Sequence, residues 1–186
     1  MTRILDLLLL LITACVLALP IALITLLVKL TSNGPTLYWS SRVGQNNILF
    51  AMPKFRTMQL DTPAVATHLL ENPTQYLTPV GSFLRKSSLD ELPQLWCILK
   101  GQMSFVGPRP ALFNQADLIG LRTACGVQAL LPGLTGWAQV NGRDELPIPQ
   151  KVKFDHEYLL RRSLLFNVQI LWMTFLKVIR RDGVSH

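Results

Sequence analysis

Two adjacent carboxylates, Asp90 and Glu91, are the densest candidate for chemistry in this sequence. They lie in the stretch Arg85-Lys86-Ser87-Ser88-Leu89-Asp90-Glu91-Leu92-Pro93-Gln94-Leu95, with two cations before them. One interpretation is a helix capping box, in which Ser88 bonds toward Glu91 and the charges stay exposed to solvent. Pro93 argues against a capping box, because a proline at the fifth helical position would break the ladder of hydrogen bonds.

A helix that begins at Pro93 would give the carboxylates a chemical role. Proline is favoured at the first helical position, and Gly101 follows Lys100 where such a helix would end. The positive end of the helix would keep Asp90 ionised and attract phosphate to the same place. An ionised aspartate beside a phosphate can act as a nucleophile, and Mg²⁺ uses carboxylates together with substrate phosphates. The pattern therefore predicts a nucleophile and a Mg²⁺ ligand here.

Three further clusters contain residue types that bind phosphate. They are Lys54-Phe55-Arg56-Thr57-Met58, Gly107-Pro108-Arg109-Pro110, and the run from Pro132 to Arg143. Arginine pairs bidentately with phosphate, prolines fix its approach, and glycines let backbone N–H groups come close. Taken singly, each cluster is more typical of a loop with solvated charges. Neither a Walker A loop nor a G-x-G-x-x-G motif is present, so a nucleotide would have to be held by other means.

The chain that must position these residues has the size of one domain and the composition of a membrane-associated protein. Of its 186 residues 49% are hydrophobic and only 16% charged, which favours some apolar surface in contact with lipid. The net charge of +7 fits anionic headgroups, a phosphorylated substrate or nucleic acid, so its distribution has to decide. The three cysteines and three histidines are scattered, with no disulfide or zinc spacing.

A membrane helix is predicted near the N-terminus. No charged residue occurs from Leu7 to Val28, a run that at about 1.5 Å per residue can reach through the roughly 30 Å hydrocarbon core. A signal peptide is disfavoured by the length of the run and by the lack of a small-x-small cleavage site. Pro20 predicts a kink, which permits either a bent span or a helix that turns back with both ends on one side.

The remaining pattern predicts few elements with clear boundaries. Two β-prone segments, 37–43 and 48–55, flank Gly44-Gln45-Asn46-Asn47 and indicate a β-hairpin. Residues 59–80 look mostly irregular, with one short helix around 65–70. A helix is predicted over 163–181, with a narrow polar stripe that suits either the membrane interface or the protein core. Seven basic against three acidic residues over 151–186 favour an anionic leaflet.

Taken in order, these segments resemble the bacterial sugar transferase family, the monotopic phosphoglycosyl transferases. The resemblance rests on the apolar helix broken at proline, the 54–56 stretch, and residues 83–86 running into 88–96. It continues through Met103-Ser104-Phe105-Val106-Gly107-Pro108-Arg109-Pro110 and the run 132–143, and so covers nearly the whole chain. Two features depart from the family pattern: Leu19 precedes Pro20 where relatives often have serine, and Arg161-Arg162 replaces an acidic and aromatic stretch.

The resemblance implies an activity and a mechanism. Asp90 would attack the β-phosphate of a UDP-sugar, expel UMP and form an aspartyl phosphosugar, which polyprenyl (undecaprenyl) phosphate then cleaves. Glu91 would help to hold Mg²⁺, and Arg85 and Arg109 would contact phosphate groups. With the clusters above, the residues expected to bind substrate are Lys54, Arg56, Arg85, Arg109, Gln139, Asn141 and Arg143. The identity of the sugar would depend on loops such as 59–80 and 111–131.

The resemblance also implies an architecture and a location. We expect a mainly helical α+β protein with a small β-hairpin, interfacial amphipathic helices and a re-entrant N-terminal membrane helix kinked at Pro20. Residues 1–32 would form the membrane helix and residues 33–186 a catalytic domain on the cytoplasmic face of the bacterial inner membrane, in contact with anionic lipids. The chain resembles a minimal catalytic form. Nucleic acid is not an expected partner, because the basic residues are not interleaved with exposed aromatics on one element.

Overall fold

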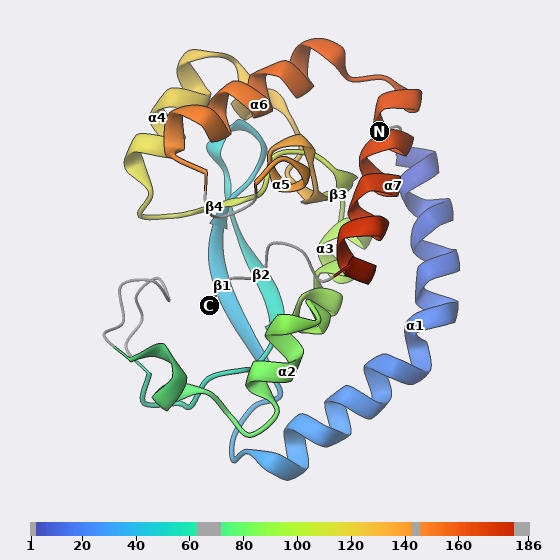
Figure 1. The fold of residues 1–186 in the computed structure, drawn as a ribbon, viewed down its shortest axis with the longest axis vertical. Coiled ribbons are helices and arrows are strands. Elements are labelled where there is room, and N and C mark those ends of the chain that lie inside the picture. Colours follow the sequence, from blue (N-terminus) through green and yellow to red (C-terminus); the bar gives the residue numbers. More distant parts are fainter. Residues whose placement is uncertain (1–2, 63–71, 143–145, 181–186) are drawn as a thin grey trace.

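The computed structural model describes residues 3–62, 72–142 and 146–180. This part of the chain is mainly helical, with two small sheets and a long apolar helix at its N-terminal end (Figure 1). The predicted α+β class with a helical majority is therefore confirmed.

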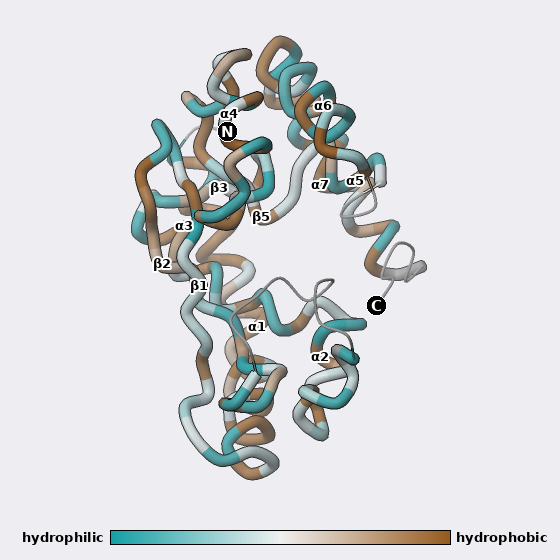
Figure 2. Tube along the Cα trace, turned by 90° about the vertical axis from the view of Figure 1, so that its left-hand side faces the viewer, coloured by the Kyte–Doolittle hydropathy of each residue, from teal (hydrophilic) through white to brown (hydrophobic). Residues whose placement is uncertain are grey.

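Helix α1 (Arg3–Thr31) contains the whole predicted apolar run, including Pro20. Its 29 residues correspond to about 43 Å of helix at 1.5 Å per residue, enough by length and composition to cross a membrane. Figure 1 shows the helix running down one side of the molecule and then turning under its lower end. Its colouring in Figure 2 is largely hydrophobic, and most of its leucines are exposed.

Both ends of α1 are attached to the rest of the protein. Near the start, the buried Asp6 carboxylate accepts hydrogen bonds from Ser104 Oγ (2.9 Å) and from the Phe105 backbone N–H (3.0 Å). Near the end, the buried side chain of Val28 belongs to a cluster with Phe55 and Leu84. The apolar stripe of α1 between these points also contacts the core, so one face of the helix packs on the body along its length.

The predicted hairpin is present as β1 (Leu37–Val43) and β2 (Leu49–Phe55), paired antiparallel. The turn between them contains the short 3₁₀ helix η1 (Gln45–Asn47), where Asn46 and Asn47 have φ of 54° and 61°. Asparagine tolerates this left-handed region better than most residues, which explains the amide-rich turn. Strand β4 (Ala111–Leu112) pairs with the other edge of β1.

A second sheet joins β3 (Ser104–Val106) and β5 (Gly133–Thr135) in parallel, and the sequence analysis did not predict it. The two chains approach very closely: a Cβ on Gly133 would lie 2.1 Å from the Gly107 nitrogen. Glycine is needed at this position because backbone occupies the space of a side chain. The carboxyl ends of both strands therefore bring the Gly107–Pro110 turn beside Gly136.

The segment around the two carboxylates differs from the expected helix that begins at Pro93. After α2 (Gly81–Lys86), a 3₁₀ helix η4 (Leu89–Gln94) contains the carboxylates and Pro93, and α3 (Leu95–Leu99) follows directly. Pro93 has no N–H to donate in a 3₁₀ helix either, so the hydrogen bonds come from its neighbours: the Glu91 N–H donates to the Ser88 carbonyl (3.3 Å) and the Leu95 N–H to the carbonyls of Leu92 and Pro93. Ser88 has φ of 56° and its side chain makes no capping bond, so the capping box is also absent.

The C-terminal half is built from helices that cover the parallel strands. They are α4 (Ala116–Ala124), α5 (Trp137–Val140), α6 (Ile148–Arg161) and α7 (Leu164–Arg180), with short 3₁₀ turns η3 (Pro73–Tyr76) and η5 (Val127–Ala129) elsewhere. Helix α7 confirms the helix expected over 163–181. The helix expected at 65–70 lies outside the described residues.

The polar stripe of α7 points into the protein. Asn167 is buried and accepts a hydrogen bond from Tyr158 Oη (2.9 Å), and Thr174 Oγ1 bonds Thr135 Oγ1 (2.6 Å). The side of α7 that remains exposed is apolar and includes Trp172 and Phe175, which stack on each other.

Candidate active site

Asp90 and Glu91 lie in η4, which packs against strand β2. The Asp90 residue is only 8% exposed, so burial in the body withdraws its carboxyl from most of the solvent. The left-handed backbone at Ser88 turns the chain from α2 into η4, so that the two acidic side chains face the end of β2. A local reversal thus places both carboxylates among the cations of other elements.

Two cations from distant parts of the sequence bind Glu91. Lys54 Nζ on β2 lies 2.8 Å from Glu91 Oε1, and Arg109 Nη2, beyond the end of β3, lies 3.0 Å from the same oxygen. Lys54 also lies 3.9 Å from Asp90 Oδ2. The structure therefore brings together Lys54, Asp90, Glu91 and Arg109, four residues that the sequence analysis assigned to one site.

Arg85 approaches the same carboxylates from α2. Its Nε donates to Thr57 Oγ1 (3.0 Å) and its Nη2 lies 3.3 Å from Met58 Sδ. Burial lowers the pKa of Arg85, while the negative charge of Asp90 raises it, so the guanidinium and the Asp90 carboxylate interact electrostatically. The residues after β2 therefore orient Arg85 toward the carboxylate pair.

The pKa values of the two carboxyls move in opposite directions. Burial raises the pKa of Asp90, the Lys54 charge counters this in part, and the neighbouring Glu91 adds to the increase. Burial would also raise the pKa of Glu91, but Arg109 and Lys54 outweigh it and hold that pKa well below its ordinary value. Glu91 is thus firmly ionised, whereas the protonation of Asp90 responds to its surroundings.

Arg56 lies apart from this site. Its guanidinium donates to Ser32 Oγ (2.7 Å) and to the carbonyls of Ser32 and Asn33, just after the end of α1. Cations at this position satisfy the last carbonyls of a helix and complement its dipole. The described contacts of Arg56 are therefore with the end of α1, although Arg56 follows Lys54 by only two residues in the chain.

The expected substrate residues on α5 lie beside the Gly107–Pro110 turn. Gln139 is 8% exposed, and neither polar atom of its amide has a hydrogen-bond partner. Its Oε1 lies over Gly136, which in turn is packed against the Gly107 carbonyl. Asn141 donates to the Trp137 carbonyl (2.8 Å), while Arg143 lies outside the described residues.

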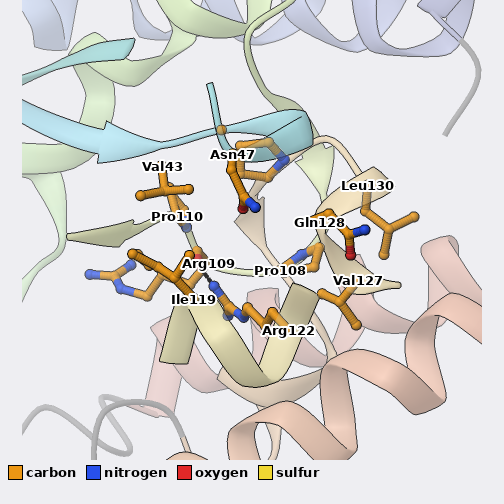
Figure 3. Close-up of a pocket in the computed structure, with 13 residues that line it drawn as sticks. Val43, Asn47, Pro108, Arg109, Pro110, Ile119, Arg122, Val127, Gln128 and Leu130 are labelled. Atoms are coloured by element: carbon orange, nitrogen blue, oxygen red, sulfur yellow. Dashed lines mark hydrogen bonds between the residues drawn. The ribbon is translucent and has the colours of Figure 1, made fainter. Parts of the chain in front are cut away.

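A small cavity of about 30 Å³ lies beside the Pro108–Pro110 segment, lined in part by Asn47, Arg122 and Gln128 (Figure 3). In the figure the Arg109 side chain extends away from this cavity. Its volume suits a water molecule rather than a substrate. The cavity is therefore separate from the carboxylates and belongs to the support of the Arg109 turn.

The donor set at Asp90 and Glu91 fits Mg²⁺ in its usual mode in nucleotide enzymes. Mg²⁺ takes one or two carboxylates and completes its shell with water and substrate phosphates. Both ion pairs of Glu91 use Oε1, and no group of three or more His, Cys, Asp or Glu side chains that could hold a metal occurs within the described ranges. These carboxylates could thus hold the ion jointly with a phosphorylated substrate.

Sequence reasoning missed two residues next to this site, Arg122 on α4 and Asp155 on α6. Both are buried, they form an ion pair, and Arg122 also donates to the Arg109 carbonyl. Neither lies in a recognisable motif. Arg122 is the one charged residue over 118–142, whereas Asp155 lies among other charges such as Lys153 and Glu157, so neither stands out without the fold.

Comparison with known proteins decides the family. The sequence model described as bacterial sugar transferase matches residues 1–181. This chain belongs to the bacterial sugar transferase family. Within that family, it is 38% identical to an undecaprenyl-phosphate galactose phosphotransferase of Salmonella typhimurium over 81% of this chain and 34% of the relative. It is 39% identical to the UDP-glucose:undecaprenyl-phosphate glucose-1-phosphate transferase of Escherichia coli over 83% of this chain and 35% of the relative.

A relative of similar length also matches. The uncharacterized sugar transferase EpsL of Bacillus subtilis is 37% identical over 85% of this chain and 77% of its own length. By contrast, this sugar transferase spans only about a third of the Salmonella and Escherichia proteins. The matched portion of those longer relatives is thus the region that corresponds to the fold described above.

Proposed function

We propose that this sugar transferase moves a sugar 1-phosphate from a UDP-sugar to undecaprenyl phosphate and releases UMP. Family membership and the names of the Salmonella and Escherichia relatives support the reaction class. The observation that carries the proposal is a buried Asp90 with a raised pKa, beside an ionised Glu91, within reach of cations from β2, α2 and the turn after β3.

In the first half-reaction, a carboxylate oxygen of Asp90 attacks the β-phosphorus of the UDP-sugar. A phosphorus–oxygen bond to Asp90 forms, the bond from the β-phosphorus to the bridging oxygen breaks, and UMP leaves with that oxygen. Lys54, Arg85 and Arg109 bind the diphosphate and offset the repulsion between its charge and the carboxylate. The product on the enzyme is an aspartyl phosphosugar.

In the second half-reaction, an oxygen of undecaprenyl phosphate attacks the same phosphorus. The new phosphorus–oxygen bond forms the lipid-linked sugar diphosphate, and the bond to Asp90 breaks to regenerate the carboxylate. The charges of Lys54, Arg85 and Arg109 stabilise the departing Asp90 carboxylate, whereas the charge of Glu91 raises the pKa of Asp90 and so favours it as a nucleophile. Two easier displacements replace one difficult transfer.

Mg²⁺ is the proposed cofactor, held by Glu91 and Asp90 together with the diphosphate. The bound ion would neutralise charge on the transferred phosphoryl group. Glu91 suits this role because it remains ionised over the whole physiological pH range. The contribution of the protein is to fix the two carboxylates side by side on the short η4 turn.

We further propose that α1 is re-entrant, bent at Pro20, and that residues 1–32 form the membrane segment of a catalytic domain spanning 33–186. Asp6 and Val28, on opposite sides of Pro20, both pack on the same body, which a helix ending on the far side of a bilayer could not do. A UDP-sugar is a cytoplasmic metabolite. The body should therefore lie on the cytoplasmic face of the inner membrane.

The remaining membrane contact is proposed to come from the exposed apolar side of α7 and from neighbouring apolar side chains. Trp172 and Phe175 suit the headgroup layer, as aromatic residues do in interfacial helices. Lys100, which lies over the Trp96 ring, is a cation that could meet anionic lipids at the same level. This face would present the catalytic carboxylates to a lipid phosphate at the membrane surface.

UMP release tests the proposed function directly. The purified enzyme is mixed with a panel of UDP-sugars, each with and without undecaprenyl phosphate, in the presence of Mg²⁺. We expect sustained UMP release with at least one sugar only when the lipid phosphate is present. Absence of UMP with every sugar would contradict the proposal. A gel-shift assay with DNA and RNA at several salt concentrations tests the separate expectation that nucleic acid is not a partner.

A further inference from the structure

The strongest buried ion pair among the described residues joins α4 to α6 behind the active site. Arg122 is 9% exposed and Asp155 1%, and Arg122 donates from Nε (2.9 Å) and Nη2 (2.6 Å) to the same carboxylate oxygen, Oδ2. Burial raises the pKa of Asp155, while Arg122 lowers it. Replacing such a pair by apolar residues is often neutral for stability, so the pair calls for another role.

The remaining guanidinium nitrogen of Arg122, Nη1, indicates that role. Its Nη1 donates a 2.8 Å hydrogen bond to the backbone carbonyl of Arg109. Figure 3 shows Arg122 directly beneath the Pro108–Pro110 segment, with the Arg109 side chain extending outward. The next carbonyl, that of Pro110, accepts a bond from Arg42 Nη1 (3.2 Å). The short turn that carries Arg109 is thus held from below through its carbonyl groups.

The turn is held mainly through its carbonyl groups, since the Gly133 N–H also donates to the carbonyl of Pro108 (2.9 Å). Pro108 and Pro110 have no backbone N–H to anchor the turn. The cavity of about 30 Å³ lies along one side of the turn, so side-chain packing is incomplete there. Arginine alone offers a planar fork that can hold a carboxylate with two nitrogens and a carbonyl with a third. The carbonyl bond fixes the peptide plane next to the Arg109 side chain.

We infer that Arg122 and Asp155 form a positioning device for Arg109. Asp155 orients the Arg122 guanidinium, Arg122 holds the Arg109 carbonyl, and Arg109 then reaches Glu91 Oε1 at 3.0 Å and the diphosphate of the substrate. The inference rests on the proposed role of Arg109 in phosphate binding. It adds two residues on α4 and α6 that touch no substrate and act through Arg109.

A double-mutant cycle tests the inference with UDP as the titrated ligand. The four proteins are wild type, Arg122→Met/Asp155→Leu, Arg109→Ala, and the combined triple variant. Calorimetric titration gives the UDP dissociation constant of each, and thermal melting reports its fold. We expect the apolar pair to weaken UDP binding about tenfold, as loss of one charge-assisted bond does. In the Arg109→Ala background the same replacement should have no further effect.

Tyr158→Phe is the matched control. It removes another buried hydrogen bond from α6 to a backbone carbonyl, that of Val106 (3.2 Å), without touching Arg109. Its UDP affinity should stay within about twofold of wild type, the scatter usual for independent sites. If the double replacement fails to fold, Arg122→Lys takes its place in the cycle, because it keeps a charge opposite Asp155 but loses the planar fork.

Two outcomes would overturn the inference, and they differ. Equal weakening of UDP binding by the pair replacement in wild-type and Arg109→Ala backgrounds would show that the pair acts independently of Arg109. An Arg109→Ala variant with wild-type UDP affinity would refute the phosphate role of Arg109, and the inference with it. The transferase activity itself is tested separately by UMP release.

Discussion

Asp90 and Glu91 are neighbours in the chain, yet their surroundings shift their pKa values in opposite directions. Glu91 receives two cations on one oxygen and stays ionised, whereas burial raises the pKa of Asp90 although the nearby cations lower it. Pairs of titratable groups whose pKa values are pushed apart are typical of active sites. The environment therefore favours Asp90 as the reacting group and Glu91 as the fixed charge.

Asp90→Asn should abolish turnover while leaving the fold intact. The amide has no carboxylate oxygen to attack phosphorus. Because the folded-state pKa of Asp90 is raised, the free energy of unfolding falls as the pH rises from the unfolded pKa to the folded pKa, and this cost in stability persists at higher pH. The amide lacks this cost, so at pH 7 the variant should melt at the same temperature as wild type or higher. UMP release and thermal melting of purified protein check both parts, and near wild-type turnover would refute the covalent route.

The acid limb of the kcat/KM profile should lie above the ordinary aspartate pKa of about 3.9. Only ionised Asp90 can attack, and its raised pKa moves the loss of activity to higher pH. Lys54 lowers this pKa, so Lys54→Met should shift the limb further up in pH. The measurement is UMP release across the acidic range for both proteins. A limb that moves to lower pH in Lys54→Met would contradict the assignment.

Glu91→Gln should both weaken the fold and impair metal-dependent turnover. The low folded-state pKa of Glu91 means that its ion pairs stabilise the protein above the unfolded pKa and are lost as the pH falls. The variant should lose about 1 to 3 kcal/mol at pH 7. Its Mg²⁺ titration of UMP release should shift to higher concentration. Full activity of the wild-type enzyme in EDTA would show that the metal role is wrong.

Sequence reasoning grouped the central charges correctly because each lay in a short motif with its own chemistry. Lys54, Asp90, Glu91 and Arg109 come together from three separate parts of the chain, and their roles in catalysis and binding stay predictions. Arg56 shows the limit of that reasoning. It lies in the same motif as Lys54, but its described contacts are with the end of α1. Tertiary packing decides to which side each side chain near the end of the strand points, and the motif does not contain that information.

At the scale of elements, local signals predicted local structures. The hairpin β1–β2 and helix α7 were found because alternation, turn residues and apolar runs mark them in the sequence. The β3–β5 pair was missed because three-residue strands carry no periodic signal and their partners are far apart in the chain. The η4–α3 segment was misplaced because the chain is already helical, as a 3₁₀ turn, before Pro93, and the hydrogen bonds come from residues on either side of the proline.

Pro20→Ala should straighten α1 and move some molecules toward a spanning topology. The substitution restores one backbone hydrogen bond and removes the clash with the carbonyl four residues back. The measurement uses Thr2→Cys in a protein whose natural cysteines are replaced, labelled in intact cells with an impermeant reagent. With Pro20 present, position 2 should be protected. With alanine at position 20, labelling should increase.

Ser41→Cys is the control for this experiment. Ser41 is exposed on β1, in the body that should remain cytoplasmic in either topology, so it should resist external labelling in both backgrounds. External reactivity of position 2 in the protein with proline at position 20 would rule out a re-entrant α1. Labelling of Ser41→Cys would instead mean that the reagent had entered the cells.

In the whole molecule, the long apolar helix α1 shares a hydrophobic core with the body. Leu10 and Val28 of α1 are buried among residues of the body, Arg3 donates to the carbonyls that end α3, and Arg56 binds the backbone that leaves α1. Lys54 lies near the end of β2, two residues before Arg56. The end of α1 and one of the cations that bind Glu91 are therefore joined by one short stretch of chain.

The attachment of Asp6 has a consequence for protein engineering. An unrelated transmembrane helix of equal length would supply apolar surface, but it would offer Ser104 and Phe105 no carboxylate. Such a chimera would lack the contacts that α1 makes with the hydrophobic core of the body. A fragment without α1 would expose Phe55 and Leu84 to water. Helix α1 of this sugar transferase is thus not an interchangeable module, and transplanting it requires transplanting the residues that it packs against as well.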